Sequence, residues 1–192
     1  MGLTIMSKPA MKISNGKLFL ISMLVGIVFV VSYSWYKSPT RHYKLIRNVD
    51  KSEIYLTDQL QGSDFEQLAR LHIATLVDMR PDGEARDQIP SQKVAELSKQ
   101  NRITFEYIPI PHGEIPSFGV DRLSSVLTNG NRPILMYCRT GNRALRTFCL
   151  ADATRKDGHS SAELKSIAKS AGFFVNDLQP EIARRIAARS SK

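Results

Sequence analysis

The chain is predicted to fold as an α/β domain around a central, mostly parallel sheet, and three features of the sequence support this. From about residue 49 onward, short apolar segments with strand character alternate with amphipathic segments of helix length. The segment PILMYC, residues 133–138, is almost continuously apolar, as expected for a central strand covered on both faces. Only helical patterns follow it. Strands that alternate with helices are joined by crossovers, which make neighbouring strands parallel.

Each element of this domain has its own local signal. Strands rich in β-branched and aromatic residues are expected at residues 53–57, 75–79, 104–110 and 133–138. Helices are expected at residues 63–72, 91–100, 117–128, 143–156, 161–172 and 178–190. Ser63 with Glu66, and Ser160 with Glu163, have the spacing of a capping box, and Gly130 is placed to end a helix. The segment RPDGE, residues 80–84, has the composition of a turn.

A separate apolar segment precedes the domain. Residues 18–36, LFLISMLVGIVFVVSYSWY, carry no charged side chain, and their length suits a helix that crosses a bilayer. Tyr33, Trp35 and Tyr36 lie at one end, as in an interfacial aromatic belt. A transmembrane anchor is the first hypothesis, and a signal peptide cleaved before Trp35 is the alternative. We therefore expect a basic tail at 1–17, the anchor at 18–36, a linker at 37–48 and the folded domain at 49–192.

The net charge of +9 belongs mostly to the N-terminal part of the chain. Seven basic residues and no acidic residue occur up to Arg47, whereas the remainder has 20 basic and 18 acidic residues. This balance gives no basic face for the phosphate backbone, so a nucleic-acid partner is not expected. Basic residues flank the apolar segment on both sides, and the positive-inside rule barely separates the two orientations. The short leading tail favours an orientation in which the domain faces outward, away from the cytoplasm.

The segment CRTGNR, which follows the central strand, carries the candidate chemistry. Cys138 ends the strand where a helix begins, and this edge of an open α/β sheet is where ligands bind. The N–H groups and dipole of the helix start favour the reactive thiolate form of Cys138. Gly141 lets the backbone amides curl inward, and Arg143 offers a planar fork for phosphate or sulfonate. The anion-binding loop comprises Arg139, Thr140, Gly141 and Asn142. A buried structural thiol, as expected for Cys149, is the alternative.

The loop and the scaffold resemble different families. Cysteine phosphatases have five residues between cysteine and arginine, whereas this chain has four, as in the six-residue loop of rhodanese sulfurtransferases. The scaffold resembles the three-layer dual-specificity or tyrosine phosphatase fold. The combination resembles the N-terminal phosphatase-like, sulfur transferase domain of beta-lactamase hydrolase-like proteins, over roughly residues 46–178. The segments that carry this resemblance are RPDGE at 80–84, FEYIPI at 105–110, PILMYCRTGNRA at 133–144 and AELKSIAKSAGF at 162–173.

The resemblance implies a bacterial sulfurtransferase that forms a persulfide on Cys138, with a small anionic donor such as thiosulfate and an acceptor thiol. The alternative is a phosphatase hydrolase with a phosphocysteine on Cys138. It needs a general acid, and the candidates are His112, Glu114 and Asp82. Sulfur transfer needs no such acid, because sulfite leaves as an anion. A catalytically silent anion-binding module is the third possibility.

No metal or cofactor is expected, because His42, His72 and His159 are isolated in the sequence. The expected location is the bacterial inner membrane, as a single-pass protein whose domain faces the periplasm.

Overall fold

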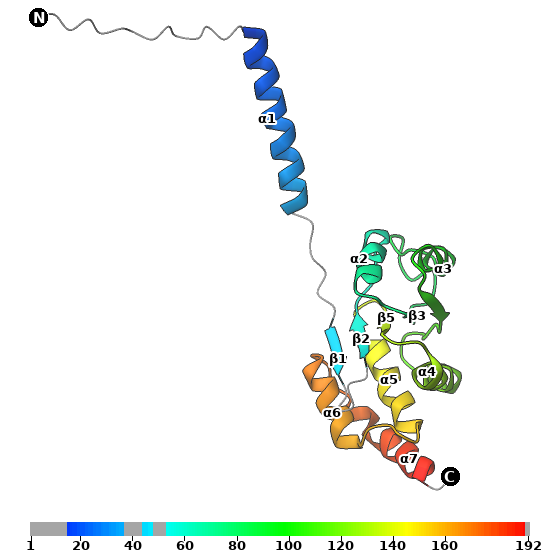
Figure 1. Ribbon diagram of the computed structural model, residues 1–192. Coiled ribbons are helices and arrows are strands. Elements are labelled where there is room, and N and C mark those ends of the chain that lie inside the picture. Colours follow the sequence, from blue (N-terminus) through cyan, green and yellow to red (C-terminus); the bar gives the residue numbers. More distant parts are fainter. Residues whose placement is uncertain (1–14, 37–43, 48–52, 191–192) are drawn as a thin grey trace, which may run out of the picture. The chain divides into compact units, whose positions relative to one another are not determined.

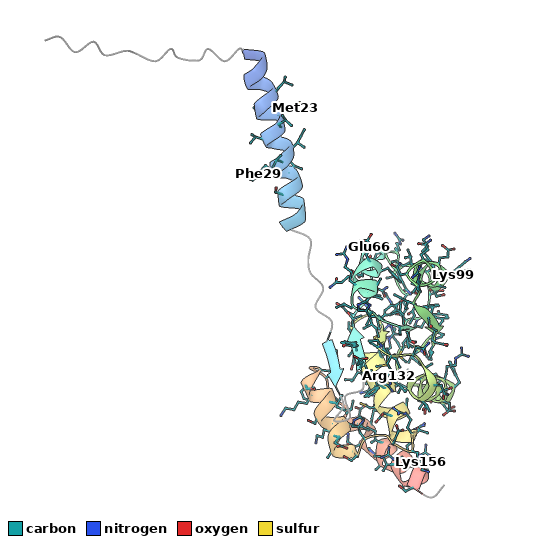
Figure 2. All side chains as sticks on the ribbon, viewed as in Figure 1. Met23, Phe29, Glu66, Lys99, Arg132 and Lys156 are labelled. Carbon is teal, nitrogen blue, oxygen red and sulfur yellow. The ribbon has the colours of Figure 1, made fainter. Side chains whose placement is uncertain are left out.

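The computed structural model describes residues 15–36, 44–47 and 53–190 of the chain. It divides into two compact units, residues 1–41 and residues 42–192. The first unit contains one described element, helix α1 (Asn15–Tyr36). Its described apolar side chains, Met23 and Phe29 among them, are exposed and point away from the helix axis (Figure 2). The structure describes only part of the side chains of α1, and among the residues that it describes no helix is long and apolar enough to span a membrane.

The second unit is built on a five-stranded sheet with the order β1-β2-β5-β3-β4 (Figure 1). Its strands are β1 (Lys44–Arg47), β2 (Glu53–Thr57), β3 (Thr75–Asp78), β4 (Thr104–Tyr107) and β5 (Ile134–Tyr137). The pairs β2–β5, β5–β3 and β3–β4 are parallel, and β1 pairs with β2 antiparallel. All four residues of β5 are buried. The prediction of a mostly parallel sheet with residues 133–138 at its centre is therefore confirmed.

Helices cover both faces of this sheet and give three layers. One core cluster joins the sheet to α2 (Phe65–Arg70) and α3 (Ser91–Gln100). The other core cluster joins the opposite face to α4 (Ser117–Asn129), α5 (Asn142–Thr154), α6 (Ser161–Ser170) and α7 (Gln179–Ser190). Two short 3-10 helices, η1 (Gly62–Asp64) and η2 (Asn176–Leu178), precede α2 and α7. Side chains of β5 alternate between the two clusters, as the two-residue period of a strand requires.

Two predictions about the start of the domain were wrong. Residues 44–47 were assigned to a linker, but they form the edge strand β1. Four residues that begin and end with a basic side chain give too short a pattern to reveal a strand, and β1 exists because β2 pairs with it. The capping box was assigned to Ser63 and Glu66, but the Gln61 N–H donates to the Asp64 carboxylate at 2.7 Å.

Other boundaries differ by a few residues for local reasons. Helix α2 ends at Arg70, because the chain reverses through His72 at a φ of +55° and the Ile73 N–H donates to the Leu68 carbonyl. Strand β4 ends at Tyr107, before two prolines that cannot donate to a ladder. The capping box of Ser160 and Glu163 is confirmed, as is the end of α4 at Gly130.

Candidate functional site

Cys138 lies where the central strand ends and the loop to α5 begins. Cys138 is 1% exposed, and its side chain belongs to the core cluster that contains α4 and α5. Because β2, β5, β3 and β4 run parallel, their carboxyl ends meet at one edge of the sheet. The loops that follow β3, β4 and β5 therefore converge around this cysteine.

Gly141 gives the loop its shape. It has a φ of +86°, in the left-handed region, and α5 begins at the next residue. A Cβ at this position would lie 3.3 Å from the Thr57 carbonyl oxygen and 3.4 Å from the Leu56 side chain. Both the backbone angle and the close approach of β2 therefore favour glycine. Arg139, Thr140 and Asn142 are exposed around it.

Arg143 is held by groups from two other loops. Its Nη1 and Nη2 atoms donate to Oε1 and Oε2 of Glu84, both at 2.7 Å. Nη1 also donates to the carbonyl oxygen of Ile110. The side chains of Arg143 and Glu84 are 12% and 14% exposed. Glu84 lies in the turn after β3 and Ile110 in the loop after β4, so three loops of the sheet edge meet at one guanidinium.

Glu84 and Ile110 occupy only part of the Arg143 guanidinium. An arginine side chain has five N–H donors, and three of them are taken by Glu84 and Ile110. The remaining two are the Nε–H and one Nη2–H, which form the side edge of the fork. Burial alone would lower the pKa of Arg143, but Glu84 and the neighbouring Cys138 outweigh it, so this pKa is raised. A charged, oriented fork therefore lies beside the cysteine.

Glu84 is itself fixed by a second arginine. The Arg80 Nε donates to Glu84 Oε2 at 3.0 Å, and the Arg80 side chain is 4% exposed. Burial raises the pKa of the Glu84 carboxyl, but its hydrogen bonds from Arg143 and Arg80 are stronger and leave it below the ordinary value. Glu84 is therefore an ionised acceptor that orients Arg143, and it is poorly suited to donate a proton.

The three general-acid candidates lie in different settings. His112 is exposed, and its Nε2 lies 3.6 Å from Glu84 Oε1, which places it at the edge of the arginine cluster. Glu114 is exposed on the same loop. The Asp82 carboxylate accepts the Ser91 N–H at 2.7 Å and the Ser91 hydroxyl at 2.6 Å. Asp82 therefore caps the start of α3, whereas His112 lies beside Glu84 in the cluster that holds Arg143.

Residues 46–156 match the family described as the beta-lactamase hydrolase-like protein, phosphatase-like domain. The chain belongs to this family. Its beta-lactamase hydrolase-like relatives include a protein of Xylella fastidiosa, strain 9a5c, 22% identical over 130 residues that cover 67% of this chain and 30% of the relative. The relative from Agrobacterium fabrum is 22% identical over 112 residues, 58% of this chain and 26% of that protein. The phosphatase-like domain thus spans under a third of the length of these relatives.

Solved structures share the fold of the phosphatase-like domain. A Neisseria meningitidis protein that is described as a phosphatase has a TM-score of 0.61 and 25% identity. The match covers 73% of this chain and 95% of that one. The core catalytic domain of the PP-IP phosphatase SIW14 from S. cerevisiae has a TM-score of 0.55 at 19% identity, covering 80% and 94%. PTPMT1 has a TM-score of 0.57 at 13% identity, covering 78% and 99%. The predicted phosphatase-like fold is confirmed.

Sequence reasoning missed three side chains of the phosphatase-like domain that support the loop. Glu84 and Arg80 both lie in the RPDGE segment, where only Asp82 was considered. Gln59 follows β2, and its backbone N–H donates to the Arg139 carbonyl at 3.3 Å. The only signal in the sequence is the spacing of four residues between Arg80 and Glu84, which also suits an ordinary surface ion pair.

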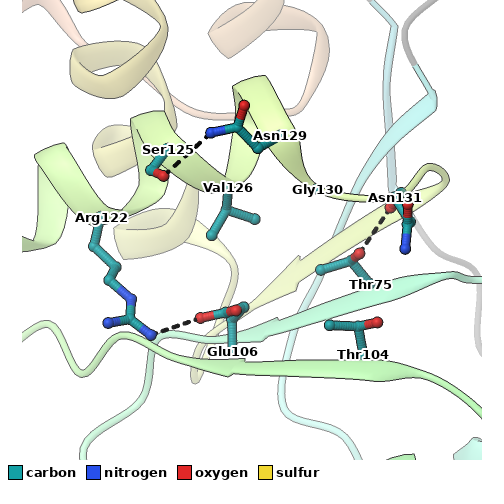
Figure 3. A pocket seen from close by; sticks show the side chains of 9 residues that line it. All are labelled: Thr75, Thr104, Glu106, Arg122, Ser125, Val126, Asn129, Gly130 and Asn131. Atoms are coloured by element: carbon teal, nitrogen blue, oxygen red, sulfur yellow. Dashed lines mark hydrogen bonds and ion pairs between the residues drawn. The ribbon is translucent and has the colours of Figure 1, made fainter.

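A polar pocket at the other end of the phosphatase-like domain is distinct from the cysteine loop. It is lined by Thr75, Thr104, Glu106, Arg122, Ser125, Val126, Asn129, Gly130 and Asn131 (Figure 3). Thr75 and Thr104 are the first residues of β3 and β4, whereas Cys138 follows the last residue of β5. Arg122 is paired with Glu106 at 2.9 Å. Within the described part of the chain, no group of three or more His, Cys, Asp or Glu could hold a metal ion.

Proposed function

We propose that this domain is a cysteine-dependent phosphatase that acts on phosphate monoesters, with Cys138 as the nucleophile. The observation that carries the proposal is the Arg143 guanidinium beside Cys138, whose Nε–Nη2 edge is not used by Glu84 or Ile110. A guanidinium edge of this kind matches two oxygens of a phosphoryl group. The fold shared with the Neisseria structure, which is described as a phosphatase and is 25% identical, supports the same chemistry.

The reaction has two steps. The Cys138 thiolate attacks phosphorus, a sulfur–phosphorus bond forms, and the bond to the leaving oxygen breaks. His112 donates a proton to that oxygen, which leaves as the alcohol. Water then attacks the phosphocysteine, releases inorganic phosphate and restores the thiolate, with His112 accepting the proton of the water. Arg143 and the loop amides neutralise the equatorial oxygens in both steps.

Sulfur transfer is the second candidate, and the four residues between Cys138 and Arg143 favour it. A ring of amides this small suits a persulfide better than a phosphoryl group. In this alternative the thiolate takes the outer sulfur of thiosulfate, sulfite leaves with the bonding pair, and the persulfide passes its sulfur to an acceptor thiol. The family match and the related folds favour the phosphatase over this first expectation from sequence.

One preparation of the full-length chain tests both candidates. Hydrolysis of 4-nitrophenyl phosphate that is lost in Cys138→Ser and kept in Cys149→Ser supports the phosphatase. Cys149 is a suitable control because it is also buried but lies on α5, where burial raises the pKa of its thiol to about 12. A mass gain of one sulfur atom after incubation with thiosulfate, without phosphate release, would establish sulfur transfer instead.

Residues 18–36 are proposed to anchor the domain in the inner membrane with the domain in the periplasm. Their lack of charged side chains supports this. Carbonate extraction of membranes should leave the full chain in the pellet and release a variant that lacks 18–36. Both native cysteines are buried, so Lys156→Cys provides an exposed thiol (Figure 2). Its labelling by a membrane-impermeant maleimide in intact spheroplasts would support the periplasmic side, and its protection would reverse the orientation.

A further inference from the structure

Arg80 is a buried arginine that lies behind the cysteine loop. It is the second residue after β3, and the whole residue is 3% exposed. Its backbone N–H donates to Asp78 Oδ1 at 2.9 Å, which fixes the start of the turn. A buried guanidinium is costly unless several acceptors surround it, so its partners indicate what it is for.

The side chain of Arg80 bridges two supports of the loop. Its Nη1 donates to Gln59 Oε1 at 2.7 Å, and its Nε donates to Glu84 Oε2 at 3.0 Å. Gln59 holds the carbonyl of Arg139, next to the cysteine, and Glu84 holds Arg143 at the other end of the loop. One side chain therefore connects both ends of the anion-binding loop.

Arg80 also changes the charge of the site. Glu84 alone would cancel the charge of Arg143 and would present a carboxylate to an anionic substrate. With Arg80, two guanidinium groups share this carboxylate, so the three side chains Arg80, Glu84 and Arg143 together keep one positive charge. Charges in such a partly buried cluster are screened less than charges on the open surface.

We propose that Arg80 is a positioning residue that keeps Arg143 both oriented and positively charged by compensating Glu84. The inference rests on the proposed function only in taking the loop to bind a phosphate-like anion. Removing the Arg80 charge should weaken anion binding, and removing the Glu84 charge as well should restore it. Orientation, by contrast, depends on Glu84 and should not return in the double variant.

The test uses the full-length chain and inorganic phosphate as the probe. The dissociation constant is measured by calorimetry, and kcat and KM are measured with 4-nitrophenyl phosphate. Arg80→Met should raise the dissociation constant about tenfold, the order expected for one charge acting over roughly 10 Å at an effective dielectric constant of about 20. Arg80→Lys keeps the charge but lacks the rigid planar fork that reaches Glu84 from Nε and Gln59 from Nη1, so it should lose kcat more than phosphate affinity.

The double variant Arg80→Met with Glu84→Gln is the decisive comparison. We expect its phosphate affinity to return to near the wild-type value while kcat stays at least about tenfold lower. Arg155→Met is the matched control, because Arg155 has a side chain only 8% exposed and pairs with two aspartates at the far end of α5. It should leave phosphate affinity and KM unchanged.

Three results would overturn the inference. If the losses of phosphate affinity in the single variants add up in the double variant, Arg80 contributes only to folding. The same conclusion follows if Arg80→Met and Arg155→Met have equal effects. A wild-type chain that binds no phosphate would also overturn it. If phosphate binding responds as expected but no variant or wild type hydrolyses the ester, the inference stands and the proposed phosphatase activity fails.

Discussion

Asp78, at the end of β3, is predicted to make the stability of the domain depend on pH. The residue is 1% exposed, and burial raises the pKa of its carboxyl from 3.8 to about 6, although the hydrogen bond from the Arg80 backbone N–H partly opposes this. The folded protein therefore binds this proton more tightly than the unfolded chain does. The stabilising contribution is complete below about pH 4 and is lost as the pH rises through about 6.

The magnitude follows from the two pKa values. Their difference of about 2 corresponds to about 3 kcal/mol at about 1.36 kcal/mol per pKa unit. In Asp78→Asn the side chain cannot ionise, and its amide oxygen can still accept the Arg80 N–H. We therefore expect the free energy of unfolding of the variant, relative to wild type, to increase by up to about 3 kcal/mol between about pH 4 and pH 7.5.

Urea unfolding of both proteins, followed by near-ultraviolet circular dichroism at several pH values, measures this difference. Asp121→Asn serves as the control, because Asp121 is exposed on α4 and should show no such trend. A difference between Asp78→Asn and wild type that does not change with pH would refute the argument, since it would mean that Asp78 is as well solvated in the folded state as in the unfolded one.

Three further changes test the loop and its support. Gly141→Ala should destabilise the domain by about 1–2 kcal/mol and reduce turnover, because a Cβ is unfavourable at its left-handed φ. Gly62→Ala is the control for urea unfolding, because nothing lies within 4 Å of its Cβ position. Glu84→Gln should lower kcat for 4-nitrophenyl phosphate at least about tenfold. Because the pKa of Glu84 is lowered on folding, its ion pairs stabilise the wild type above the ordinary pKa of a glutamate, and this stabilisation is lost as the pH falls. The difference in unfolding free energy between the two proteins should therefore shrink in acid. Phe148→Ala should cost about 3–5 kcal/mol of unfolding free energy in a thermal or urea melt, because this α5 side chain is fully buried.

The elements of the domain were predictable where the signal is local. The strand at 133–138 has an apolar run, α3 has a helical period, and α6 has a capping box within four residues. The edge strand β1 was not predictable, because its existence depends on hydrogen bonds to β2.

The same division holds for the candidate site. Cys138, Gly141 and Arg143 could be placed together from the sequence, because a strand end, a left-handed turn and a helix start follow one another within six residues. The sequence does not show that Glu84, 59 residues before Arg143, orients the guanidinium, or that Arg80 and Gln59 support both ends of the loop, because these contacts form only in the folded chain. Parallel strands bring their carboxyl ends to one edge wherever they lie in the chain, and no local pattern records which side chains meet there.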